Sequence, residues 1–321
     1  MARALIIDTD PGHDDAMAIL LAAKHFEILG LTTTHGNQTV DKTTKNALKI
    51  LEFSGLTHVP VARGSEHPLI QPLTPHPSGH GESGLDGPSL PEPTTRIHPK
   101  HAVEFIVDTV MSTDGVTLVT IGPLSNVGSA FRREPRIASR IREISMMGGA
   151  TQVGNTAPVS ELNVECDPEA AHIVFTSGVP IKMVGLNLTR QAEATPERRA
   201  RLQALGNRVG QIAYEIVEWY SQRVQAMYGL RGASLHDPCA VAWLIDPTLI
   251  DSVRAHVAVE LDGQFTRGMT VCDLRHITAP GTPVKGGGGT KPGEPPNVEI
   301  GMRLDVERFF DLLLDTLAKY P

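Results

Sequence analysis

The sequence has few cysteines, few aromatic residues and no strongly basic segment. Its three cysteines, Cys166, Cys239 and Cys272, are too scattered for a zinc site, and their odd number argues against a disulfide framework. They are expected to be reduced, buried thiols. The formal net charge is −7, from 29 basic and 36 acidic residues. A protein of this charge, without a Lys/Arg run, is not expected to bind nucleic acid.

Long apolar runs are missing as well. The first three residues lead into a short apolar run that ends at Asp8, which is too brief for a signal peptide or a membrane span. We therefore expect a cytoplasmic protein with no membrane partner. A chain of 321 residues can bury a full core, so a single domain over residues 1–321 is expected.

The sequence does contain an alternation of short apolar runs with segments of helical spacing, which is typical of βαβ units. Strands are predicted at 4–7, 28–34, 59–62, 116–121, 141–147 and 181–186, and helices at 14–24, 40–53, 101–111 and beyond 123. This pattern predicts an α/β fold, a single Rossmann-like domain with a mostly parallel sheet and helices on both faces. Ligands on such sheets bind beyond the carboxyl ends of the strands.

Two segments interrupt the alternation. Residues 68–93 are rich in Pro, Gly and His and predict a long loop, which in a compact domain is often an active-site lid. Residues 278–296 contain four consecutive glycines and predict a flexible connecting loop with no assigned function.

The strongest chemical signal is a group of four carboxylates, Asp8, Asp10, Asp14 and Asp15, at the point where the first strand turns into a helix. So much negative charge in one turn is unfavourable unless a cation neutralises it. Oxygen ligands alone favour Ca²⁺ or Mg²⁺ over zinc. The alternative is that two of these residues cap the helix and the other two are solvated.

A distant carboxylate, Asp237, is a candidate to complete such a site. It precedes Pro238 and an apolar, helix-like segment at 239–245, so taken alone it is an N-cap. Taken with the first group, it suits a metal ligand. The adjacent His236 then suits a general acid, although it could also be an ordinary core histidine.

Together these segments resemble the inosine-uridine nucleoside hydrolase family. Residues 8–16 look like its DxDPGxDDA signature, and further matches follow in family order at 36–37, 80–84, 122–126, 147–149, 161–163, 167–171 and 236–238. The resemblance implies hydrolysis of the N-glycosidic bond of ribonucleosides to ribose and free base, with Ca²⁺ as cofactor. It also implies a small-molecule nucleoside as the only substrate class, and a homo-oligomer, dimer or tetramer.

The resemblance further implies a role for individual residues. Asp10, Asp15, Asp237 and the main-chain carbonyl of Ile121 would hold Ca²⁺, with Asp8 in support. Asp10 would take a proton from the calcium-bound water, and His236 would protonate the leaving base. Substrate contacts would come from Asp14, Asn37, His80, Met147, Asn155, Glu161, Leu162 and Asn163.

These residue types suit the chemistry. Cleavage of the C1′–N bond develops oxocarbenium character on the ribose, and a cation-held water supplies the nucleophile. Because Ca²⁺ is a weaker acid than zinc, a carboxylate must complete the deprotonation of that water.

The sequence also departs from the family pattern. Leu162 stands where a Phe is frequent, and Val224 falls near a Tyr position that Tyr228, one helical turn later, could partly replace. Trp243 is expected within an apolar helix, so a pocket that sandwiches a purine between tryptophans is not expected. The preferred base is left open.

Two other functions compete with this interpretation. Asp8-Thr9-Asp10 superficially resembles the nucleophile motif of haloacid-dehalogenase-like phosphohydrolases, which would require Mg²⁺ and a downstream Lys. The residues that follow, Pro11 to Asp15, disfavour that alternative, and release of inorganic phosphate would distinguish it. The other possibility is a catalytically inert nucleoside- or calcium-binding protein on the same fold, which only an assay of ribose release can separate from the enzyme.

Overall fold

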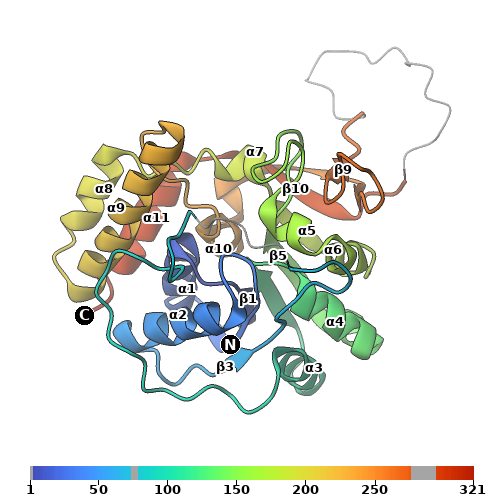
Figure 1. The fold of residues 1–321 in the computed structure, drawn as a ribbon, viewed down its shortest axis with the longest axis horizontal. Helices are drawn as coiled ribbons and strands as arrows, with labels where there is room; N and C mark the ends of the chain where they lie inside the picture. The colour runs from blue at the N-terminus through green and yellow to red at the C-terminus, as the bar shows by residue number, and fades with distance from the viewer. Residues whose placement is uncertain (1–2, 74–78, 276–293) are drawn as a thin grey trace.

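A twisted eight-stranded sheet runs through the centre of the protein (Figure 1), as seen in a computed structural model that describes residues 3–73, 79–275 and 294–321. The strand order is β3-β2-β1-β4-β5-β6-β10-β7, and all neighbouring pairs are parallel except β10 and β7. The strands are β1 (Ala4–Thr9), β2 (Glu27–Thr33), β3 (Val61–Arg63), β4 (Val116–Thr120), β5 (Ile141–Met147), β6 (Ile181–Val184), β7 (Ile250–Ala255) and β10 (Val298–Leu304). A separate antiparallel pair is formed by β8 (Val257–Val259) and β9 (Thr270–Cys272).

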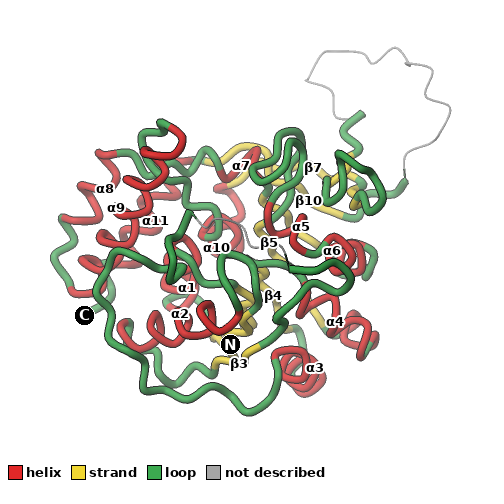
Figure 2. The backbone as a smooth tube through the Cα atoms, in the orientation of Figure 1, coloured by secondary structure: helices red, strands yellow, loops and turns green. Residues whose placement is uncertain are grey.

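Helices cover both faces of this sheet (Figure 2). One face packs against α1 (His13–Ala23), α2 (Val40–Phe53), α8 (Pro196–Gln203), α9 (Arg208–Tyr228), α10 (Pro238–Ile245) and α11 (Val306–Leu317). The other face packs against α3 (Ala102–Ser112), α4 (Ser125–Arg133), α5 (Leu162–Cys166) and α6 (Pro168–Phe175). The short α7 (Leu186–Thr189) follows β6, and single turns of 3-10 helix occur at Pro135–Ser139 and Pro247–Leu249. Two apolar cores result, one on each side of the sheet.

The side chains of β1 show why both cores form. Leu5 and Ile7 belong to the core beneath α1, whereas Ile6 between them belongs to the core beneath α3 and α4. Successive side chains of a strand point to opposite faces, so a run of apolar residues is buried on both sides. Helix α1 is buried almost all round because it lies between the sheet and the outer helices α9, α10 and α11.

The predicted fold is confirmed, with differences at the ends of elements. The strand predicted to reach Leu186 ends at Val184, and Leu186 begins α7. The third strand starts at Val61 rather than Val59. The antiparallel edge strand β7 was not predicted, because its burial alternates irregularly and gives no clear period.

The two predicted loops differ in how much of them is described. Residues 68–73 and 79–93 contain no helix or strand, in agreement with the loop prediction, and residues 74–78 lie outside the described residues. Of the second loop, residues 278–293 lie outside the described residues. All three cysteines are free thiols; Cys166 and Cys239 are buried and Cys272 is half-buried. Among the helices of the described residues, none is both long and apolar enough to cross a membrane.

Candidate active site

Four aspartates meet at the carboxyl edge of the sheet, where β1 ends and α1 begins. They are Asp10, Asp14, Asp15 and Asp237, called the acidic cluster below, and all are buried. Carboxylate oxygens of Asp14, Asp15 and Asp237 lie within 4.8 Å of one another. The chain thus brings Asp237, at the start of α10, into contact with the first turn of α1.

Neighbouring donors hold two of these carboxylates in fixed orientations. Asp15 accepts hydrogen bonds from the Thr9 hydroxyl (2.5 Å) and the Gly12 N–H (2.8 Å). One oxygen of Asp10 accepts the Asn37 N–H at 2.6 Å, and the Asn37 side-chain amide donates to Asp15 at 3.4 Å. The other oxygen of Asp10, Oδ1, is buried and has no hydrogen-bond partner among the described residues. This orphaned oxygen is available to an added ligand.

The position of the Asp237 carboxylate distinguishes between a role as the N-cap of α10 and a role as a metal ligand. The residue occupies the N-cap position of α10, yet no capping hydrogen bond to its side chain is made within the described part of the chain. Its carboxylate lies instead against those of Asp14 and Asp15. The Asp14 carboxylate in turn accepts the backbone N–H of His236 at 3.2 Å. The ordinary capping role of a residue before proline is therefore not what Asp237 does here.

The acidic cluster forms no ion pair with a Lys or Arg of the described residues. His80 Nε2 lies 3.9 Å from Asp14 Oδ1, but burial lowers the pKa of His80 well below its ordinary value, so this ring is neutral at pH 7. Burial, followed by repulsion from Asp15, raises the pKa of Asp14 to about 7. Burial, followed by repulsion from Asp15 for Asp10 and from Asp14 for Asp237, holds the pKa values of these two residues well above their ordinary range. A bound cation would remove this repulsion.

Asp8 lies outside the cluster and supports it from the strand. Its Oδ1 accepts hydrogen bonds from the Thr32 hydroxyl (2.6 Å) and from the Asn126 side-chain amide (2.8 Å). Burial raises the pKa of Asp8 to about 7. Asn126 was not predicted to have a role of its own. Its place after β4, at the same edge of the sheet, was the signal that it could contact Asp8.

The backbone at Gly36 shows why small residues surround Asp10. Gly36 has a φ of +151°, and a Cβ built there would lie 2.0 Å from Asp10 Oδ2. A larger residue at this position would displace the carboxylate. The Gly36-Asn37 pair therefore holds Asp10 through close backbone approach together with the Asn37 hydrogen bond.

A second group of polar residues lies at the carboxyl ends of β4 and β5. Glu161 caps α5 by accepting the Asn163 N–H at 3.0 Å, and it also accepts the Gly149 N–H at 2.8 Å. Asn163 donates from its side chain to the carbonyls of Met147 (3.1 Å) and Ile121 (3.4 Å). Burial raises the pKa of Glu161 to about 7. Glu161, Asn163 and Met147, which were predicted as substrate contacts, are thus linked by hydrogen bonds to the Ile121 carbonyl, which was predicted as a metal ligand.

Asn155 and Leu162 lie at the edge of that network. Asn155 is exposed, and its side-chain carbonyl accepts the Leu162 N–H at 3.0 Å. Its hydrogen bond therefore anchors the loop before α5. Leu162 is half-buried and begins that helix.

His80, predicted as a substrate contact, and His236, predicted as the general acid, both lie close to Asp14. His236 contacts the Thr189 hydroxyl through Nδ1 at 2.7 Å, and burial with the nearby charge of Arg190 lowers its pKa to about 4. His80 stacks on Tyr220 with ring centroids 4.6 Å apart. Tyr220 and Thr189 were not singled out from the sequence, since each lies within a helix where its type carries no functional signal.

The aromatic residues discussed from sequence have separate environments. Trp243 is fully buried within α10, as predicted, and Trp219 stacks on His13. Val224 is buried beside Tyr220, whereas Tyr228 is 67% exposed at the end of α9.

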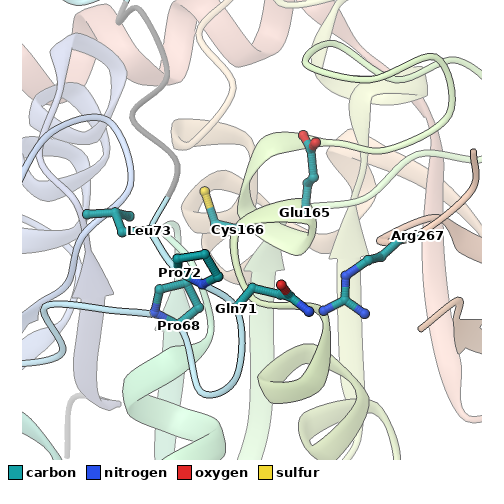
Figure 3. A pocket seen from close by; sticks show the side chains of 7 residues that line it. All are labelled: Pro68, Gln71, Pro72, Leu73, Glu165, Cys166 and Arg267. Carbon is teal, nitrogen blue, oxygen red and sulfur yellow. The ribbon is translucent and has the colours of Figure 1, made fainter. Parts of the chain in front are cut away.

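A pocket of about 290 Å³ opens between the segment 68–73 and the end of α5 (Figure 3). It is lined by Pro68, Gln71, Pro72, Leu73, Glu165, Cys166 and Arg267. Burial and then the charge of Asp10 raise the pKa of the Cys166 thiol, so this wall of the pocket is close to the acidic cluster. No residue of the acidic cluster lines the pocket itself. The pocket adjoins the carboxylates but does not contain them.

Comparisons with known proteins agree with this geometry. Residues 5–311 match the family model described as inosine-uridine preferring nucleoside hydrolase. The pyrimidine-specific ribonucleoside hydrolase RihA of Escherichia coli (strain K12) is 41% identical over 324 residues, covering 100% of both chains. RihA of Shewanella sp. (strain MR-7) is also 41% identical, covering 100% of this chain and 98% of that one.

Solved structures show the same likeness. A plant nucleoside hydrolase, PpNRh1, superposes with a TM-score of 0.88 at 32% identity, covering 99% of this chain and 100% of that chain. A purine-preferring ribonucleoside hydrolase from Gardnerella vaginalis gives a TM-score of 0.87 at 29% identity, covering 98% of each chain.

The fold and these relatives define an N-glycosidase, an enzyme that hydrolyses ribonucleosides. The chain belongs to the inosine-uridine preferring nucleoside hydrolase family. This membership confirms the resemblance found in the sequence and sets aside the phosphohydrolase alternative.

Proposed function

We propose that this enzyme cleaves ribonucleosides with Ca²⁺ held by Asp10, Asp15, Asp237 and the Ile121 carbonyl, and with Asp10 as the general base. The observation that carries the proposal is the buried acidic cluster without a Lys or Arg partner in the described chain, in which Asp10 Oδ1 lacks a hydrogen bond. Its donors are all oxygens, which suits a hard cation. Asp14 lies in the same group, so its carboxylate contributes to the field at this site.

Ca²⁺ at this position would supply positive charge that keeps the carboxylates ionised and makes a nearby water more acidic. Asp10 accepts the proton of the attacking water through its unpartnered Oδ1. Asp14, Asn155, Glu161 and Asn163 bind the ribose hydroxyls, and Asn37 lies at the ribose end of the site. Because these groups are already fixed by the hydrogen bonds described above, they are oriented for the oxocarbenium-like ribose without further ordering. Asp8 holds the end of β1 in place.

The remaining predicted contacts line the sugar and the base. Met147 and Leu162 border the ribose at the ends of β5 and α5, and His80 and His236 face the base. His236 is neutral at pH 7 in the free protein, given its pKa of about 4. Negative charge that develops on the departing base raises that pKa, so His236 takes up a proton from solvent as the bond breaks and passes it to the base.

We further propose that pyrimidine nucleosides are the preferred substrates. The support is the 41% identity over the full chain to hydrolases named pyrimidine-specific, against 29% to the structure named purine-preferring. The buried Trp243 and the Trp219 that stacks on His13 agree with this, because a sandwich of two tryptophans around a purine would need both to be available.

The test is a reducing-sugar assay of the calcium-loaded enzyme with uridine, cytidine, inosine, adenosine and guanosine. We expect uridine and cytidine to give kcat/KM values at least about tenfold above those of the purines, a difference of about 1.4 kcal/mol. Equal or reversed preference would contradict the substrate proposal and leave the metal proposal intact. Chelation followed by titration with Ca²⁺, Mg²⁺ or Zn²⁺ tests the metal separately, and recovery with Zn²⁺ rather than Ca²⁺ would contradict it.

A further inference from the structure

His13 occupies the variable position of the acidic signature, and neither the sequence analysis nor the proposed chemistry gives it a role. Its side chain is fully buried at the first turn of α1. One ring nitrogen, Nε2, lies 2.8 Å from the carbonyl oxygen of Asp86. The other, Nδ1, lies 2.9 Å from Nδ1 of His80. The imidazole therefore bridges two parts of the loop 80–86.

The same ring is the centre of an aromatic group. His13 stacks on Trp219 with centroids 5.0 Å apart and planes inclined by 2°, and on Tyr220 and His80 with centroids 5.1 Å apart in both cases. Trp219 and Tyr220 come from α9, and His80 comes from the loop. One side chain thus ties the start of α1, the loop and α9 together.

The contacts leave His80 little freedom. A Cβ built on Gly12 would lie 2.7 Å from His80 Nδ1, so the histidine ring packs directly onto the backbone of the acidic signature. On its far side the ring faces Asp14, with Nε2 3.9 Å from Oδ1. A rotation of the His80 ring would break the contact with His13 and change the position of Nε2 beside Asp14.

The hydrogen-bond directions strengthen this coupling. The Asp86 carbonyl can only accept, so His13 donates through Nε2–H. The backbone N–H of His13 also donates to His80 Nδ1 at 3.2 Å, so one ring nitrogen of His80 contacts both the main chain and the side chain of His13. These contacts fix the orientation of the His80 ring from the first turn of α1.

We propose that His13 is a positioning residue for the base half of the active site, which fixes the orientation of His80 and holds the loop 80–86 against α1 and α9. This role rests on the proposed placement of His80 at the nucleobase. It is distinct from the metal chemistry, because among the described residues the side-chain contacts of His13 are with His80, Asp86, Trp219 and Tyr220 and not with the acidic cluster.

Two substitutions separate the parts of this role. His13→Phe keeps a flat ring for stacking but removes both hydrogen bonds. His13→Asn keeps an amide near the Nδ1 position, so it retains a partner for His80 and loses the one for Asp86. His25→Phe is the matched control, since His25 follows the other end of α1 and contacts Thr316 at 2.9 Å, away from the site. Thermal melting shows that each variant is folded.

We expect His13→Phe to lower kcat/KM for uridine by about tenfold or more, because a small misplacement of a substrate-contacting group has effects of this size. His13→Asn should recover part of the loss, and His25→Phe should equal the wild type. Inhibition by ribose, which has no base, and the affinity for Ca²⁺ should be unchanged in His13→Phe. Loss of ribose inhibition or of Ca²⁺ binding in a folded His13→Phe variant would overturn the proposal.

A double-mutant cycle with His80→Ala gives the decisive measurement. If His13 acts through His80, His13→Phe should change kcat/KM by less than about twofold once His80 is removed, since residues that act as one unit are not additive. If the fold-changes in kcat/KM of the two single variants multiply in the double variant, the proposal is overturned. An unaltered kcat/KM in His80→Ala alone would also overturn it by removing His80 from the base, while calcium-dependent turnover would stand.

Discussion

The two edges of the central sheet treat their carboxylates in opposite ways. Near the amino-terminal edge, Glu143 of β5 forms ion pairs with Arg3 and Lys182, both at 3.2 Å. At the carboxyl edge, the four aspartates of the acidic cluster pair with no Lys or Arg of the described residues. The active site is distinguished by buried negative charge for which the described residues supply no Lys or Arg partner.

Among the predicted changes, substitution of Asp10 at the carboxyl edge should have the largest effect, and this effect is on kcat. Asp10→Ala removes the proposed base and a proposed metal ligand together, so we expect kcat to fall by a factor of at least about 1,000. Steady-state release of ribose measures the effect, with the exposed Asp262→Ala as the control. Activity within about tenfold of the wild type, only about 1.4 kcal/mol of barrier, would contradict the mechanism.

Loss of the general acid should have the next largest effect. A purine accepts a proton at N7 as its bond breaks, whereas a pyrimidine has no equally basic ring nitrogen. We expect His236→Ala to reduce kcat for inosine by about a hundredfold and that for uridine much less. Equal reductions would indicate that His236 only orients its neighbours. Unchanged Ca²⁺ affinity in the variant is the control, because Asp237 is the next residue.

The stability of the metal-free protein should depend on pH because of the acidic cluster. The folded-state pKa values of Asp8 and Asp14 are raised to about 7 from 3.8, so between about pH 4 and pH 7 the folded state binds more protons than the unfolded state. Stability in chelator must then fall as pH rises through this range. We expect a melting temperature at least about 3 °C lower at pH 7.5 than at pH 5.5.

Added Ca²⁺ provides the control for that measurement. A cation that neutralises the cluster should raise the melting temperature more at pH 7.5 than at pH 5.5. A melting temperature that rises with pH in chelator would show that the acidic cluster is not the source of the pH dependence of stability. An equal effect of Ca²⁺ on the melting temperature at both pH values would show the same.

The smallest effect is expected at the amino-terminal edge of the sheet, where Glu143 has cationic partners. Glu143→Gln removes a carboxylate whose cationic partners remain partly exposed, at 23% for Arg3 and 20% for Lys182. We expect a loss of unfolding free energy of about 1 kcal/mol or less and an unchanged kcat. Chemical denaturation and the ribose assay measure both. A large loss of activity would mean that charge balance at both edges matters for catalysis, and the comparison would no longer hold.

Much of the architecture could be predicted because local patterns carry it. The apolar run of β1 and the all-round apolar α1 follow directly from the first 24 residues, and the predicted bounds of α2 and β5 coincide with those observed. The edge strand β7 and the exact start of α7 could not be predicted, since an edge strand is partly solvated and has no continuous apolar run.

The sequence by itself determined the chemical character of the site. Asp10, Asp14 and Asp15 are close in the chain, so their concentration of charge and its need for a cation can be read from their spacing. It also determined Glu161 and Asn163 as candidates through resemblance. What it left open was the choice between capping and clustering for Asp237, since a carboxylate before a proline suits either role.

Only the tertiary structure decided that choice and the role of His13. The packing of α10 against α1 brings the Asp237 carboxylate to Asp14 and Asp15 and away from its own helix. The role of His13 could not be predicted from its local sequence. Its side chain contacts His80, Asp86 and Trp219, which lie far along the chain. Local patterns report charge and periodicity, whereas the direction of a buried side chain depends on which distant segments fold against it.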